Sequence, residues 1–111
     1  MATPIELAFD STVAANTTDM QLSSIVPNGS QVILREFSGS CTNGNWCGLQ
    51  WGNGSSWTTV RGSHGVFYFD FRNMTFTGDG VNRFRLLRAN LDVINVQRIF
   101  VHLSAVIRNG E

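Results

Sequence analysis

The feature that most constrains the fold of this chain is a two-residue alternation of apolar and polar side chains that recurs along its length. The alternation is clearest over residues 66–72, where Phe67, Phe69 and Phe71 fall on one side of an extended backbone. Successive side chains of a β-strand point to opposite faces of the sheet. The pattern therefore predicts a strand with one face against a core.

Eight or nine strands are predicted in this way. The clearest candidates span residues 31–37, 66–72, 83–89 and 98–108, and weaker ones span 5–9, 20–26, 49–51, 57–60 and 74–77. Turn-forming pairs such as Asn43-Gly44 and Asn53-Gly54 separate these runs. Short strands at intervals of about ten residues are typical of a sandwich or barrel. We therefore expect one all-β domain over residues 1–111, an antiparallel β-sandwich of the jelly-roll type.

Three segments fall outside this pattern. Residues 89–96 are expected to form a loop, and residues 1–4 and 109–111 are expected to be short tails. The segment 1–9 is extended in character, so it could also pair with the edge of a partner's sheet.

The charge composition limits the class of partner. The chain has eight arginines, no lysine and eight acidic residues, so its formal net charge is zero. Electrostatic binding to nucleic acid or to an anionic membrane is therefore not expected. Charged residues make up 14% of the chain, where about 25% is usual. A surface of small polar residues and arginine suits a protein interface, although turn-rich β proteins are also rich in small polar residues.

No basic segment followed by an apolar run marks an export signal at the amino terminus, and no stretch approaches the roughly 20 apolar residues of a membrane span. We expect synthesis in the cytoplasm. Cys41 and Cys47 are close enough in sequence for a disulfide, but the reduced form is expected without an export signal. With His64 and His102 they do not make the four spaced ligands of a zinc site, and no metal or cofactor is predicted.

No catalytic motif is present. The chain has neither Gly-x-Ser-x-Gly nor His-Glu-x-x-His. Asp70 and Asp79 could form a glycosidase pair on geometric grounds alone. Residues 78–82 could hold calcium, but they lack the dense carboxylates of a dedicated loop, so a plain turn is expected. We do not expect an enzyme.

All three tryptophans, Trp46, Trp51 and Trp57, lie among asparagine, glycine, serine and threonine. An exposed indole can stack on a sugar ring while neighbouring amides bind its hydroxyl groups. One interpretation is therefore a carbohydrate-binding module that takes a glycan. Its binding residues would be Trp46, Asn43, Asn45 and Asn53. The other interpretation buries Trp51 and Trp57 in the core and leaves Trp46 at a loop tip, where it would anchor a protein interface.

An arginine group lies in the predicted strand 83–89. Arg83 and Arg85 share the strand face opposite Phe84 and Leu86, and Arg88 follows. Such a group can clamp carboxylates on a partner protein, or its members can pair with acids on neighbouring strands. The residues predicted to bind a partner protein are Trp46, Arg83, Arg85 and Arg88.

The whole chain, including the segments 83–90 and 98–103, resembles a family of small phage proteins in its length and general character. These are the jelly-roll decoration, or staple, proteins of the epsilon-fifteen type, which lie on the outside of the heads of short-tailed bacteriophages. The resemblance implies a structural virion protein, made in the host cytoplasm, that binds the major capsid protein across capsomers and stabilises the shell. It also allows a homodimer. Contacts with several subunits would add their affinities through effective concentration.

Overall fold

The computed structural model describes residues 2–42 and 44–108. Eight strands account for most of this part of the chain: β1 (Ala2–Val13), β2 (Thr17–Leu22), β3 (Gln31–Cys41), β4 (Trp46–Asn53), β5 (Ser56–Ser63), β6 (Gly65–Thr77), β7 (Arg83–Asn90) and β8 (Gln97–Arg108). No helix among these residues is long and apolar enough to cross a membrane.

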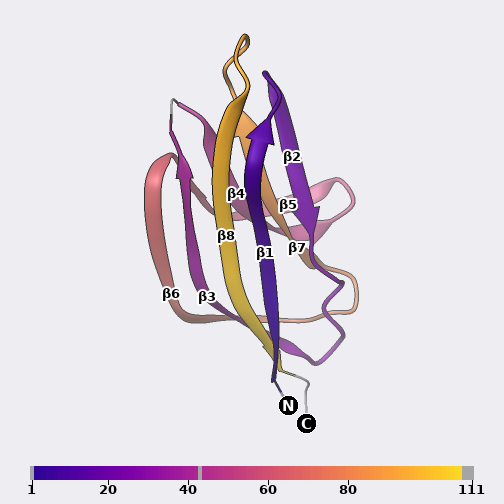
Figure 1. Ribbon diagram of the computed structural model, residues 1–111. Coiled ribbons are helices and arrows are strands. Elements are labelled where there is room, and N and C mark those ends of the chain that lie inside the picture. The colour runs from indigo at the N-terminus through magenta and orange to yellow at the C-terminus, as the bar shows by residue number, and fades with distance from the viewer. Residues whose placement is uncertain (1, 43, 109–111) are drawn as a thin grey trace.

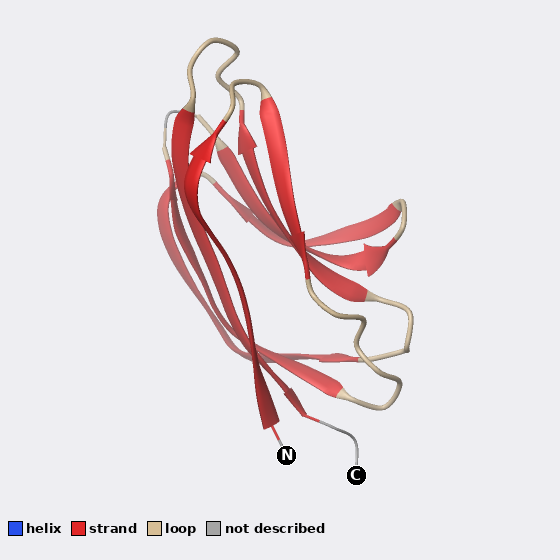
Figure 2. Cartoon of the chain, turned by 45° about the vertical axis from the view of Figure 1, so that its right-hand side comes forward, coloured by secondary structure: helices blue, strands red, loops and turns tan. Residues whose placement is uncertain are grey.

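The strands form two antiparallel four-stranded sheets with the orders β1-β8-β3-β6 and β2-β7-β4-β5. The sheets face each other as two layers (Figures 1 and 2). The strands pair as one nested hairpin, β4 with β5, β3 with β6, β2 with β7 and β1 with β8, and successive pairs alternate between the sheets. This is the jelly-roll arrangement, and the predicted fold class is confirmed.

The core lies between the two sheets and is filled by alternate residues of every long strand. Phe37, Phe84 and Leu103 are fully buried, and each such side chain contributes roughly 1.5–3 kcal/mol relative to exposure. Trp51 is half-buried and packs against this core, with its ring centroid 4.6 Å from that of Phe84, so its predicted place in the core is confirmed in part.

Three predicted boundaries need correction. The predicted strand 20–26 ends at Leu22, where β2 ends, and residues 23–26 are not in a strand. The predicted strand 74–77 is not separate, because β6 runs without interruption from Gly65 to Thr77. Arg72 and Asn73 in its middle have positive φ angles of 53° and 60°, and this irregularity shifts the alternation that divided the two candidates. The predicted tail at residues 1–4 is also wrong, because β1 begins at Ala2 and pairs with β8. The predicted tail at 109–111 lies outside the described residues.

The connections divide between the two ends of the sandwich. The β1–β2, β3–β4, β5–β6 and β7–β8 connections lie at one end, and the other connections lie at the opposite end with the chain termini (Figure 1). The β7–β8 loop, residues 91–96, projects farthest at its end in both views (Figures 1 and 2). The predicted loop over 89–96 is thus confirmed from residue 91 onward.

Candidate partner-binding surface

Strand β7 divides the predicted arginine group between its two faces. Phe84 and Leu86 are fully buried in the core, so Arg83 and Arg85 lie on the outer face of the sheet, as predicted. Arg88 lies on the inner face and is only 3% exposed. The three arginines therefore do not form one cluster.

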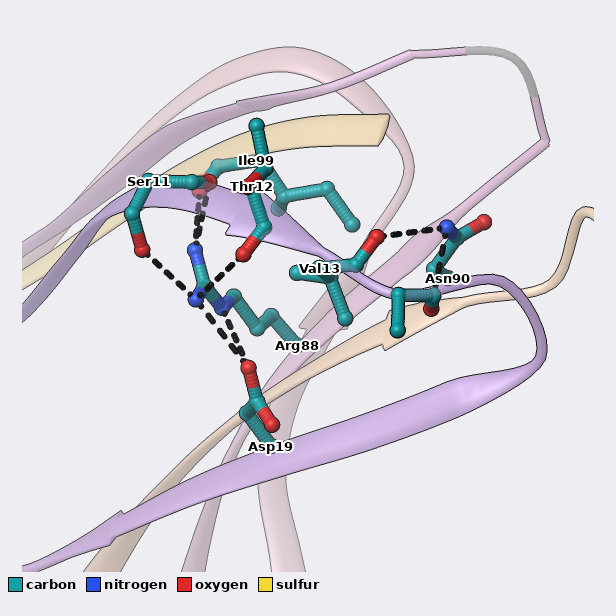
Figure 3. Close-up of polar contacts among 8 residues, drawn as sticks. Ser11, Thr12, Val13, Asp19, Arg88, Asn90 and Ile99 are labelled. Atoms are coloured by element: carbon teal, nitrogen blue, oxygen red, sulfur yellow. Dashed lines mark hydrogen bonds and ion pairs between the residues drawn. The ribbon is translucent and has the colours of Figure 1, made fainter. Parts of the chain in front are cut away.

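Arg88 holds together the corner where the two sheets meet (Figure 3). Its Nη1 donates to the carbonyl oxygens of Ser11 at 2.8 Å and Ile99 at 3.0 Å, in the sheet opposite its own. Its Nη2 donates to Ser11 Oγ at 2.9 Å and forms an ion pair with Asp19 Oδ2 at 3.0 Å. The guanidinium carbon lies 4.4 Å from the Phe9 ring centroid. These contacts occupy the guanidinium within the chain, so its role in this structure is to stabilise the fold.

Arg85 is held in place on the outer face by its neighbours. Its Nε donates to Gln50 Oε1 at 2.8 Å, and its Nη2 donates to the same oxygen. Its guanidinium carbon stacks 4.2 Å from the Trp57 ring centroid, and the Trp57 Nε1 donates to the Gly54 carbonyl at 2.6 Å. Trp57 is thus half-buried beneath Arg85, and the expectation that it belongs to the core is wrong.

Trp46 lies flat on the same outer face. It is the first residue of β4, and its indole covers two glycines that are paired across β4 and β5. A Cβ atom at Gly48 would lie 2.1 Å from Trp46 Cη2, and one at Gly62 would lie 2.7 Å from Trp46 Nε1. The indole therefore needs both glycines beneath it. Trp46 is half-buried on a strand, so its predicted position at a loop tip is wrong.

We call the outer side of the β2-β7-β4-β5 sheet the arginine–tryptophan face. The side chains that make it a candidate contact surface are Trp46, Trp57, Arg83, Arg85, Met20 and Leu22. Met20 and Leu22 are 52% and 43% exposed. The strand register places no described acidic side chain on this face. It therefore combines two cations with exposed apolar and aromatic groups. Met20, Leu22 and Gln50 were not predicted from the sequence.

The outer side of the other sheet carries several acidic side chains, and we call it the acidic face; Arg98, paired with Asp10 at 2.7 Å, and Arg108 also lie on it. Three acidic side chains form one row across this sheet: Glu6 on β1, Glu36 on β3 and Asp70 on β6. Glu6 and Glu36 both pair with Ser104 of β8, which lies between their strands, and Glu36 pairs directly with Asp70. The Tyr68 hydroxyl donates to Glu36 at 2.9 Å, and this bond raises the pKa of Tyr68. Further exposed side chains on this face are Val66, Tyr68 and Phe100, with His102 bonded to Glu6.

The described members of the predicted glycan site do not gather in one place. Asn45 is 1% exposed, and its Oδ1 accepts from the Leu91 backbone N–H at 3.0 Å. Asn53 lies at the far end of β4, and its Nδ2 donates to Asn82 at 2.6 Å. The length of β4 separates these two asparagines by on the order of 25 Å. Asn43 lies outside the described residues.

The predicted catalytic and metal candidates have other roles in the structure. Asp79 Oδ1 accepts from the backbone N–H groups of Val81 at 2.9 Å and Asn82 at 2.8 Å, and these bonds lower its pKa. Asp79 thus stabilises the turn between β6 and β7, while Asp70 lies on the acidic face. Within residues 2–42 and 44–108, no three His, Cys, Asp or Glu side chains are grouped as metal ligands.

The two cysteines meet inside the sandwich. Cys41 ends β3 in one sheet and Cys47 lies in β4 of the other, and both are fully buried free thiols. A hydrogen bond between the two sulfur groups lowers the pKa of Cys41 and raises that of Cys47.

A shallow groove of about 420 Å³ runs between the edges of the two sheets at the end near the termini. It is lined by Pro4, Ile5, Leu7, Leu22, Ile25 and Ile107 together with polar residues of β1 and of the segment after β2. Next to the groove, the backbone N–H of Ala8 in β1 donates to Gln21 Oε1 in β2 at 2.8 Å. This hydrogen bond joins the edge strands of the two sheets.

Comparison of the chain with models of known protein families, with curated proteins and with solved structures finds no match.

Proposed function

We propose that this protein is a structural virion component that binds the outside of an assembled capsid and joins neighbouring major capsid protein subunits. The observation that carries the proposal is the pair of outer faces, one with Arg83 and Arg85 and the other with Glu6, Glu36 and Asp70. A protein that bridges two subunits needs two contact regions. The two layers of the sandwich present them on opposite sides.

The arginine–tryptophan face has the composition of an energetic centre in a protein interface. Tryptophan and arginine dominate the affinity of such interfaces. Arg85 is already fixed by Gln50 and Trp57, so it loses little freedom when it binds a carboxylate. Within the part of the chain that the structure describes, no residue forms a hydrogen bond or ion pair with the Arg83 guanidinium, so this group remains available to a partner.

Weak contacts on both faces are enough for a protein that binds an assembled shell. Once one face is bound, the other meets its subunit at a high effective concentration, and the two affinities multiply. We therefore expect strong binding to assembled shells and weak binding to the free capsid subunit.

Co-sedimentation with purified empty heads of an epsilon-fifteen-type phage that lack their own decoration protein tests this proposal. We expect the wild-type protein to be retained, and the Arg83→Ala/Arg85→Ala variant to bind at least tenfold more weakly. The matched control is Arg72→Ala/Arg108→Ala, which removes two exposed arginines from the sheet that carries the acidic face and leaves the carboxylates of Glu6, Glu36 and Asp70 in place. A folded wild-type protein that stays in the supernatant would contradict the proposal.

The carbohydrate-binding alternative is tested with the same preparation on a glycan array. Because Asn45 is buried and Asn53 lies at the other end of β4, we expect no glycan binding that depends on Trp46. Saturable binding of one glycan class that is lost in Trp46→Ala would instead favour the carbohydrate-binding module.

A further inference from the structure

The β7–β8 loop exposes an unusual concentration of large aliphatic side chains. Leu91, Val93, Ile94 and Val96 are 55%, 72%, 81% and 61% exposed. They lie within six residues, on the loop that projects beyond both sheets (Figures 1 and 2). Single exposed apolar residues are normal on a protein surface, but a contiguous group of them marks a contact site.

Polar bonds inside the loop fix its backbone. Asp92 Oδ1 accepts from the backbone N–H groups of Ile94 at 2.9 Å and Asn95 at 3.0 Å. The Asp92 carbonyl accepts from the Asn16 N–H at 2.8 Å, and the Asn90 side chain donates to the Asn95 carbonyl at 2.9 Å. The loop is therefore tied to the β1–β2 turn and to the end of β7. Its aliphatic side chains are displayed on an ordered backbone.

The chemistry of the loop suits a protein pocket better than a lipid bilayer. Neither residues 89–97 nor the adjacent turn at 13–16 contains a lysine, an arginine or an aromatic residue. Loops and helices that bind membranes use basic residues to attract anionic lipids and use tryptophan or tyrosine at the interface. The Asp92 carboxylate adds a negative charge to the loop. Valine and isoleucine have few side-chain rotamers, so their burial in a shaped pocket costs little entropy.

We propose that loop 91–96 is an anchor that inserts into an apolar pocket on a partner protein. The inference rests on the proposed function in one respect, because it takes that partner to be the major capsid protein. The anchor is a contact separate from the two sheet faces, and it lies at the end of the sandwich opposite the chain termini.

The test uses the double variant Val93→Asp/Ile94→Asp in the head co-sedimentation assay. Both side chains are mostly exposed, so we expect its urea midpoint to match that of the wild type. Loss of two buried aliphatic groups is expected to weaken binding to heads roughly tenfold to a hundredfold. The control is Val81→Asp/Ile25→Asp, because Val81 and Ile25 are 54% and 47% exposed at the other end of the sandwich. This control changes the same residue types and adds the same charge.

The outcomes separate the anchor from the proposed function. If the wild type does not bind heads, both proposals fall. If the wild type and the Val93→Asp/Ile94→Asp variant bind equally well, only the anchor is overturned. Should that variant unfold, Val93→Thr/Ile94→Thr provides the same comparison, with weaker binding supporting the anchor and equal binding overturning it. Sedimentation with phosphatidylcholine–phosphatidylglycerol vesicles completes the test, since vesicle binding that either loop variant abolishes would overturn the anchor in favour of a bilayer.

Discussion

Two arginines three positions apart on β7 lie in opposite environments. Arg88 faces the interior, where its guanidinium joins the two sheets through carbonyl groups and the Asp19 carboxylate. Arg85 faces outward, and its guanidinium contacts Gln50, Trp57 and the Met20 sulfur. The same residue type therefore belongs to the fold at one position and remains on the surface at the other. The inner face of β7 therefore holds an arginine that stabilises the fold, and the outer face holds one that remains accessible to a partner.

The two environments also differ in what remains when the side chain is removed. The Arg88 guanidinium donates to the Ile99 carbonyl at a buried position. Without the guanidinium this carbonyl would lose that donor, and a buried polar group without a partner lowers the free energy of unfolding by about 1–3 kcal/mol. Around Arg85, Gln50 is only half-buried and water can replace the lost donor. The comparison therefore predicts a large effect on stability inside and a small one outside.

The largest effect is expected from Arg88→Met, which keeps the apolar stem and removes the charge. We expect a loss of roughly 3–5 kcal/mol in the free energy of unfolding, because Asp19 and several carbonyl groups lose their partner. A domain of this size has about 5–15 kcal/mol in total. Urea unfolding measures the loss, with Arg85→Met as the matched control. Equal stability of the two variants would contradict the predicted difference between the inner and the outer arginine.

Asp19→Asn tests how much of the interior effect comes from the ion pair. The variant keeps a side-chain oxygen near Arg88 and leaves the carbonyl bonds of the guanidinium in place. Because the Asp19 side chain is 38% exposed, we expect a loss of only about 1–2 kcal/mol in urea unfolding. A loss as large as that of Arg88→Met would assign the interior effect to the ion pair rather than to the carbonyl bonds.

The sequence predicted the jelly roll because alternation and turns are local properties of the chain. It also predicted the shared face of Arg83 and Arg85, since that follows from spacing along one strand. Trp57 was misplaced because the β4–β5 pairing sets it opposite Gly52, whereas the inward-facing Trp51 pairs with Thr58, so the two tryptophans lie on opposite faces of the sheet. Met20 joins the arginine–tryptophan face only through the pairing of β2 with β7. Such pairings join residues far apart in sequence, and no spacing within one strand reveals them.

Gly48→Ala tests the outer face without touching the interior. The added methyl group would overlap the Trp46 ring, so we expect the indole to leave its position on the sheet while the sandwich stays folded. The expected loss of stability is about 1 kcal/mol. Tryptophan emission should shift to longer wavelength as Trp46 becomes more exposed. The same glycine substitution in a Trp46→Phe background is the control, and a shift that persists there would show that another tryptophan is responsible.

Arg85→Ala is expected to have a smaller effect on stability than any of these. It removes the stacking on Trp57 and the bonds to Gln50, which together contribute less than about 1 kcal/mol at a partly exposed site. Binding to heads should nevertheless weaken markedly. A stability loss comparable to that of Arg88→Met would mean that the outer arginine is also a structural residue.

The smallest effect is expected from Asp92, where a carboxylate rather than a cation is held by the chain. Backbone N–H groups of Asn95 and Ile94 lower its pKa from the ordinary value of 3.8 to about 2. A lowered pKa means that the ionised group stabilises the folded state above pH 3.8, and that this contribution is lost as the pH falls from 3.8 to 2. We therefore expect the urea midpoint of the wild type to exceed that of Asp92→Asn at pH 5, and the difference to shrink as the pH falls and to disappear below pH 2. A difference that stays constant over this range would show that Asp92 stabilises the loop through its shape and not through its charge.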